Sequence, residues 1–136
     1  PAQRTDTSHL SESLLASLIS ACRAGTPVIV DVFSGADAPM ASQREAIAQT
    51  LGLLTATLWR RNLRATILAT GGDTLLSVLN ALDCRSIRPV CELQPGVVYS
   101  ECLCGEERIP VISKAGSFGG ETLLTDIAAW LAKRGI

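Results

Sequence analysis

The sequence lacks a large net charge, a long apolar run and any cluster of histidines. Its 136 residues carry 12 basic and 13 acidic side chains, so a formal net charge of -1 gives no field that would attract a nucleic acid. The apolar runs fall well short of the roughly 20 residues that span a bilayer, and the first residues do not have the pattern of a signal peptide. His9 lies in a polar stretch at the start of a helical pattern, which predicts an exposed side chain rather than a catalytic base. We therefore expect a cytoplasmic protein with no nucleic-acid or membrane partner.

The cysteine content is also lower than that of disulfide-rich proteins. The chain has 5 cysteines, an odd number, scattered over predicted helix, turn and strand. They are Cys22, Cys84, Cys91, Cys102 and Cys104. Cys102 and Cys104 lie two apart on one strand but have no histidine nearby, so the pattern does not predict a zinc site. We expect small buried side chains in a reducing compartment and no disulfide framework.

The composition predicts one domain with one core. Hydrophobic residues make up 47% of the chain, and its length is within the roughly 100–150 residues that are usual for one domain. The sequence begins with Pro1 and a polar stretch over residues 2–8, which favours a piece cut from a longer protein. We take residues 1–136 as one domain fragment.

Helical and strand patterns alternate along the chain. Apolar spacing predicts helices over residues 10–22, 41–61, 75–82 and 121–133, the first with Thr7 or Ser8 as N-cap. Branched apolar runs predict strands over residues 27–33 and 65–70, and residues 87–93 are predicted to be extended. Residues 97–103 and 108–113 flank the turn at residues 105–107 and predict a hairpin. The order indicates an α/β, Rossmann-like fold: a mostly parallel sheet with helices on both faces and a C-terminal antiparallel hairpin.

Two glycine-rich turns each follow a strand and precede a helix. The candidate binding residues in them are Gly71, Gly72, Asp73, Thr74, Lys114, Gly116, Ser117 and Gly119. Loops that leave the carboxyl ends of parallel strands share one edge of a sheet, so the two turns could meet at one ligand. Glycine lets the backbone approach a phosphate, and the start of a helix presents amide N–H groups to an anion. Thr74 and Ser117 would add hydroxyl donors and Lys114 a cation.

A simpler interpretation stays open for the first turn. Asp73 or Thr74 could cap the following helix with no ligand involved. The sequence contains neither the Walker A pattern nor the Gly-x-Gly-x-x-Gly fingerprint, so the spacing alone does not favour an ordinary P-loop or dinucleotide site. The two tryptophans, Trp59 and Trp130, lie on predicted helices, where packing on the sheet is favoured over stacking on an adenine ring.

Three motifs taken in order resemble the closing half of the four-carbon acid sugar kinase family. They are the strand ending in residues 71–74 with its apolar helix, the segment over residues 92–97, and the loop over residues 114–119. The similarity covers residues 27–136. This resemblance implies the C-terminal domain of a two-domain bacterial kinase, with ATP and Mg²⁺ as cofactors. It also implies that Glu92 and the Pro95-Gly96 turn shape the fold around the nucleotide.

The same resemblance implies what this chain does not contain. The four-carbon sugar acid, of threonate, erythronate or 3-oxo-tetronate type, would bind to an N-terminal domain, which would also supply the general base. A Gly-Ser segment on the first strand of the family's C-terminal domain has no match here, so the fragment alone is expected to be inactive. Ser117 and Asp83 replace glycines that are common in the family. The alternative function left open is a non-catalytic nucleotide-sensing or protein-interaction module. Whether the protein forms a homodimer is also left open.

Overall fold

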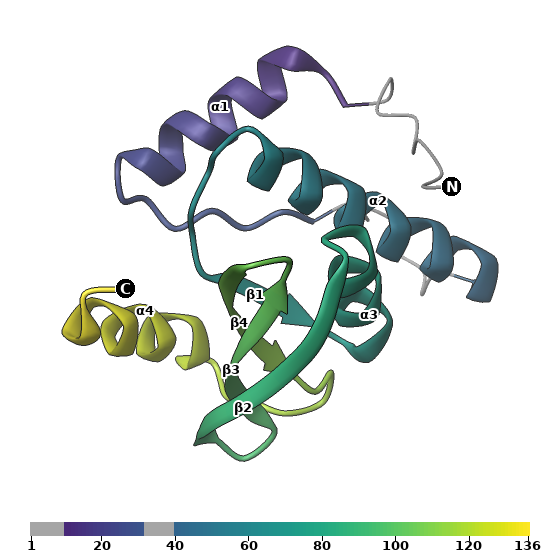
Figure 1. Ribbon diagram of the computed structural model, residues 1–136. Helices are drawn as coiled ribbons and strands as arrows, with labels where there is room; N and C mark the ends of the chain where they lie inside the picture. Colours follow the sequence, from purple (N-terminus) through teal and green to yellow (C-terminus); the bar gives the residue numbers. More distant parts are fainter. Residues whose placement is uncertain (1–9, 32–39) are drawn as a thin grey trace.

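The computed structural model describes residues 10–31 and 40–136, which form four helices and four strands (Figure 1). In chain order these are α1 (Glu12–Arg23), α2 (Ala41–Arg60), β1 (Ile67–Thr70), α3 (Gly72–Ala81), β2 (Cys84–Gln94), β3 (Val97–Cys104), β4 (Glu107–Lys114) and α4 (Leu123–Arg134). All four predicted helices are present, with ends that differ from the predicted ones by at most three residues. None of these helices combines the length and the hydrophobicity that crossing a bilayer requires.

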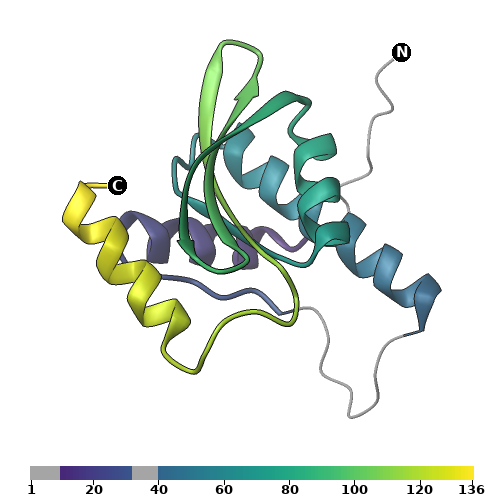
Figure 2. The ribbon, with the colours of Figure 1, turned by 90° about the horizontal axis from the view of Figure 1, so that it is seen from below.

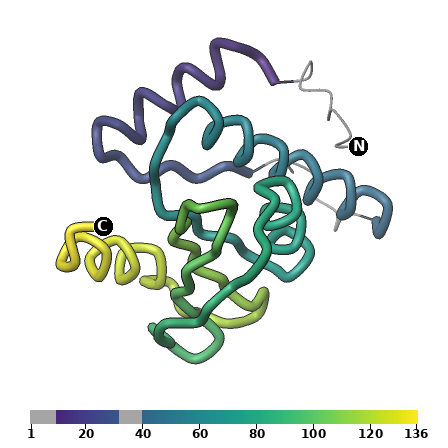
Figure 3. Tube along the Cα trace, in the orientation of Figure 1, coloured from purple at the N-terminus to yellow at the C-terminus, as the bar shows by residue number. Residues whose placement is uncertain are grey.

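The sheet is mixed, with strand order β1-β4-β3-β2. β2, β3 and β4 form an antiparallel meander, because only residues 95–96 and 105–106 separate these strands and the chain must reverse at each turn (Figure 3). β1 and β4 are the parallel pair in the described part of the chain. The predicted hairpin is confirmed, whereas the prediction of a mostly parallel sheet is wrong.

The strand predicted over residues 27–33 is absent from its described part, residues 27–31. Ile29 is 76% exposed and Val30 is 40% exposed, and the edge strand β1 pairs with no strand other than β4 among the described residues. Branched apolar residues favour a strand only where a neighbouring strand supplies hydrogen bonds and packing. Residues 32 and 33, like His9 and the predicted N-caps Thr7 and Ser8, lie outside the described residues. The N-cap of α1 is Ser11, whose hydroxyl accepts a hydrogen bond from the Leu14 amide.

Helices cover both faces of the sheet, as predicted (Figure 2). On one face α4 packs on buried residues of β3 and β4, through Leu123 and Ile127. On the other face α2 and α3 pack on a second buried cluster. Trp130 contributes to the first cluster and Trp59 to the second, which confirms their packing role. Alternate residues of the same strands therefore support two separate cores.

α3 lies close to α2 because Gly52 has no side chain at their contact. A Cβ at Gly52 would lie 2.6 Å from the carbonyl oxygen of Ser77. Arg60 at the end of α2 donates to the Ala81 carbonyl at the end of α3, at 3.4 Å. These contacts fix the helix that begins at the first glycine turn.

Cys84 and Cys104 form a disulfide, contrary to the prediction that all the cysteines would be small core side chains. The two residues are 20 positions apart in the sequence but lie opposite each other in the β2–β3 register. Spacing along the chain does not reveal such a pairing. Cys102 does behave as a small core residue, with an exposed fraction of 0%.

Candidate phosphate-binding site

The first glycine turn connects β1 directly to α3. Gly71 is the N-cap of α3 and has a φ of 88°, a backbone conformation that glycine adopts without steric cost. The first bond of the helix runs from the Leu75 amide to the Gly71 carbonyl, at 3.1 Å. The amides of Gly72, Asp73 and Thr74 precede that bond, so they have no acceptor within the helix. They form an N-terminal turn that can donate to an anion.

A capping role for Asp73 or Thr74 does not account for this turn. Within the described residues, no side chain caps the start of α3. Gly72 and Asp73 are exposed and Thr74 is half-buried. A carboxylate in the first turn suits the positive end of the helix dipole.

The second glycine turn follows β4 and extends over residues 115–120, all of them exposed. The Ala115 amide donates to the Gly96 carbonyl at 2.9 Å, and the Phe118 amide donates to the Ala115 carbonyl at 3.1 Å. The Lys114 ammonium bends over the turn and donates to the carbonyls of Ala115, at 3.2 Å, and Gly116, at 2.9 Å. The cation therefore lies on the predicted binding loop.

The two turns lie side by side at the carboxyl ends of the parallel strands. Thr70 at the end of β1 is in register with Lys114 at the end of β4. The Gly71 amide donates to the Lys114 carbonyl at 3.0 Å. The structure thus brings Gly71, the first residue of the first turn, next to Lys114 at the start of the second turn. Gly72, Asp73 and Thr74 continue the first turn into α3, and Gly116 lies in the second turn. Ser117 and Gly119 continue the exposed second turn.

The chain matches the family described as "nucleotide-binding C-terminal domain" over residues 3–124. It belongs to this family, the C-terminal domain of the four-carbon acid sugar kinases. It is 35% identical over 91 residues to a D-threonate kinase of Bordetella bronchiseptica and 31% identical over 83 residues to one of Salmonella typhimurium. These matches cover 66% and 60% of this chain, but only 22% and 20% of the kinases. The chain thus spans about a fifth of the length of these relatives.

A solved structure from Bordetella bronchiseptica has a similar fold. It is a domain of unknown function that was crystallised with bound citrate as a domain-swapped dimer. The likeness has a TM-score of 0.63 at 31% identity, and it covers 80% of this chain and 28% of that one. The resemblance stated from the three motifs is therefore confirmed at the level of the family.

In this nucleotide-binding domain, the segment over residues 92–97 supports the second glycine turn. Glu92 accepts a hydrogen bond from the Gly96 amide at 3.1 Å, which closes the Pro95-Gly96 turn between β2 and β3. The Phe118 ring packs directly on Gly96, where a Cβ would lie 2.6 Å from Cγ of the ring. Sequence reasoning gave Glu92 and Gly96 a shaping role but missed Phe118, whose only signal was an apolar residue inside a glycine-rich loop.

A groove between α2 and α3 was also missed. It is open to solvent and has a volume of about 810 Å³, and Asp73 of the first turn is among its lining residues. Its polar lining includes Glu45, Gln49, Arg60, Ser77 and Asn80. Alanines at helical spacing on α2 are the one sequence signal for it, because small side chains leave room between two helices.

We expect Gly96→Ala to lower the free energy of unfolding by about 2–3 kcal/mol, since it combines a left-handed backbone with a clash against Phe118. Gly96 has a φ of 74°. Gly105→Ala is the matched control, because Gly105 has a φ of 63° and no described atom within 4 Å of an added Cβ. Gly105→Ala should lower the free energy of unfolding by only about 1 kcal/mol, the cost of the left-handed backbone alone. Urea denaturation measures both, and equal losses would contradict the packing role of Phe118.

Proposed function

We propose that the two glycine turns bind the phosphates of ATP and that the chain is the ATP-binding part of a sugar-acid kinase. The hydrogen bond from the Gly71 amide to the Lys114 carbonyl supports this most directly, because it keeps the turns adjacent. A triphosphate needs several N–H donors and at least one cation within a few ångströms of each other. The amides of residues 72–74 would supply such donors, and Lys114, whose carbonyl accepts from the Gly71 amide, would supply a cation from the adjacent turn.

Phosphoryl transfer depends on position and charge more than on covalent help from the protein. The amides of the first turn would hold phosphate oxygens along the axis of α3. Lys114 would offset negative charge from the second turn, and Gly116 and Gly119 would let the backbone come close. Ser117 would add a hydroxyl donor. The roles are electrostatic, so the site orients the nucleotide and leaves proton transfer to other groups.

The residues present are compatible with Mg²⁺. The described residues contain no group of three or more side chains that could hold a metal ion by themselves. Mg²⁺ with a nucleotide commonly uses one or two carboxylates together with phosphate oxygens and water. Asp73, exposed in the first turn of α3, is the residue that would hold it. When bound, the ion neutralises charge between phosphate oxygens.

The choice of phosphoryl acceptor is part of the proposal and is based on the family to which the chain belongs. We propose a four-carbon sugar acid, bound by a part of the kinase outside this chain, which would also carry the general base. The D-threonate kinases that resemble the chain favour this class of acceptor. The alternative, a nucleotide-sensing or protein-interaction module without catalysis, shares the nucleotide site but needs no acceptor.

Isothermal calorimetry of the 136-residue chain with ATP tests the nucleotide site. We expect weak, saturable binding that Mg²⁺ strengthens and that ADP displaces, since the phosphates carry the contacts. An absence of ATP binding at millimolar nucleotide would contradict the proposal. For the kinase step, a protein that joins this domain to the other family domain should phosphorylate a four-carbon acid. ATP binding without any transfer to such acids would favour the non-catalytic alternative.

A further inference from the structure

The Cys84–Cys104 disulfide lies at the far end of the helix that carries the first glycine turn. Cys84 is the first residue of β2, and Cys104 is the last residue of β3. Both residues are half-buried, so part of each is exposed to solvent. Neither the predicted nucleotide site nor the family motifs involve these cysteines.

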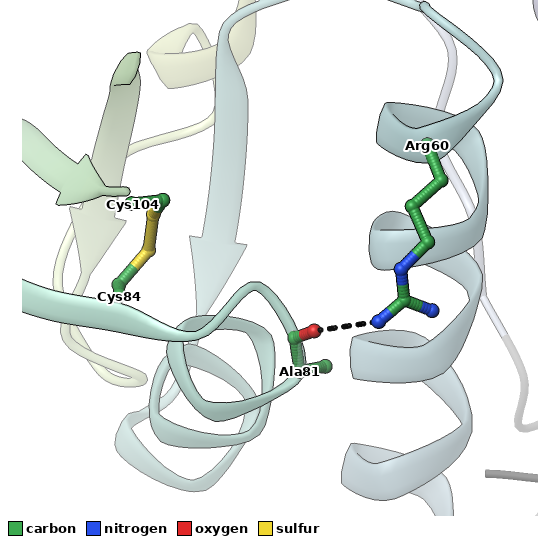
Figure 4. Close-up of a disulfide and its surroundings, with 4 residues drawn as sticks. All are labelled: Arg60, Ala81, Cys84 and Cys104. Carbon is green, nitrogen blue, oxygen red and sulfur yellow. Dashed lines mark hydrogen bonds between the residues drawn. A yellow bond between two sulfur atoms is a disulfide. The ribbon is translucent and has the colours of Figure 1, made fainter. Parts of the chain in front are cut away.

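The disulfide lies close to the C-terminal end of α3, which also packs on the second buried cluster through Leu79 and Leu82. Arg60 of α2 donates to the Ala81 carbonyl in the last turn of α3, and the disulfide follows after a two-residue connection (Figure 4). That connection contains Asp83, which has a φ of 55° although it is not glycine. Because this connection is short and contains a left-handed residue, the position of Cys84 restricts the position of the C-terminal end of α3. The disulfide therefore ties α3 to β3 covalently.

Apart from the disulfide, this part of β2 is held mainly by its pairing with β3. β2 is the edge strand of the sheet, and residues 85–90 are all exposed. Its register with β3 shifts between Cys84 and Ser86 and again between Pro89 and Cys91. Proline donates no backbone hydrogen bond to a ladder. Without the covalent link, the ladder to β3 and the exposed ion pair from Arg88 to Glu101, at 2.6 Å, would hold the first half of β2.

We propose that Cys84 and Cys104 form a reversible thiol–disulfide exchange site whose substrate is a dithiol reductant. A thiolate of the reductant attacks one sulfur of the disulfide, forms a mixed disulfide and releases the other cysteine as a thiolate, which takes up a proton. The second thiol of the reductant then displaces the remaining cysteine. Two electrons pass to the protein, which gains two thiols, and the reductant becomes a cyclic disulfide.

The third cysteine of this region does not compete in the exchange. Cys102 belongs to the same core cluster as Cys84 and Cys104, but its exposed fraction is 0%. Burial raises the pKa of the Cys102 thiol, so it stays protonated. Only the thiolate attacks a disulfide. Reduction and reoxidation therefore return the same pair.

The oxidised form keeps α3 and its N-terminal turn ordered, and the reduced form loosens both. The link from the order of α3 to nucleotide affinity rests on the function proposed above. An anion binds at the first turn only when α3 is formed. The apparent affinity for the anion therefore falls in proportion to the fraction of molecules in which α3 is formed. The exchange site would thus link the redox state of the surroundings to nucleotide binding.

The experiment compares the oxidised chain with the same chain treated with dithiothreitol. Labelling with N-ethylmaleimide in denaturant should mark three cysteines before reduction, Cys22, Cys91 and Cys102, and all five afterwards. Opening a crosslink over about 20 residues should lower the thermal midpoint by about 10 °C. Hydrogen exchange of residues 72–81 and 84–90 should become about tenfold faster. The ATP dissociation constant should rise about fivefold.

Two variants serve as controls. The double variant C22S/C91S keeps the pair and should respond to dithiothreitol as the unmodified chain does. C84S/C104S should resemble the reduced chain and show no response. Five labelled cysteines before reduction, or an unchanged exchange rate in α3 after it, would overturn the exchange site. If neither form binds ATP, the nucleotide assignment fails, while labelling, melting and hydrogen exchange still decide the redox proposal.

Discussion

Gly72→Ala is expected to weaken ATP binding about tenfold while the fold stays as stable as before, or becomes slightly more stable. A Cβ at Gly72 meets no described atom within 4 Å, so the added methyl group disturbs no packing. Alanine at the start of a helix also loses less backbone entropy than glycine, by up to about 1 kcal/mol. The methyl group would instead occupy the space that a phosphate needs above the turn. A loss of affinity with no loss of stability therefore separates ligand contact from folding.

Gly116→Ala provides the same test on the second turn, and it should also weaken ATP binding. Gly120→Ala is the matched control, since neither position has a described neighbour within 4 Å of an added Cβ. Gly71 is unsuitable, because its φ of 88° would strain any other residue and confound the result. Calorimetry gives the affinities and urea denaturation gives the stabilities. Equal ATP affinity in all three variants and the unmodified chain would mean that phosphates bind elsewhere.

The helices and the candidate site could be predicted from sequence because their signals are local. Apolar residues at helical spacing mark α2 within one residue of its observed end, and each glycine turn is a contiguous segment between a strand and a helix. The adjacency of the turns required one further rule, that loops at the carboxyl ends of parallel strands share an edge. That rule applies here through a single pair, β1 and β4.

The sheet order and the disulfide could not be predicted, since both depend on which distant segments meet. The run over residues 27–33 has strong strand propensity, but propensity does not supply a neighbour, and residues 27–31 remain outside the sheet. Cys84 pairs with Cys104 because β2 folds back on β3 with that register. The same limitation applies to the contact of Gly96 with Phe118. Each is a consequence of tertiary structure with only a weak local signal.

Lys114→Met should weaken ATP binding about thirtyfold, the factor that corresponds to about 2 kcal/mol for a lost charge-assisted hydrogen bond. Its ammonium donates to the Ala115 and Gly116 carbonyls, which leaves its third proton for a phosphate oxygen. Methionine keeps most of the apolar stem, so it removes the charge with little change in packing. The loss should be larger for ATP than for AMP, because the charge acts on phosphates.

A different role for Lys114 predicts a different pattern. If its ammonium only holds the second turn together, removing it would lower stability and reduce the binding of ATP and AMP by the same factor. Lys133→Met, at the exposed last turn of α4, is the control for losing one positive charge and should change neither. Salt separates the two roles as well. A lysine that meets phosphate makes ATP binding weaken as ionic strength rises, and Lys114→Met should reduce that dependence. An equal salt dependence in both proteins would assign Lys114 to the turn alone.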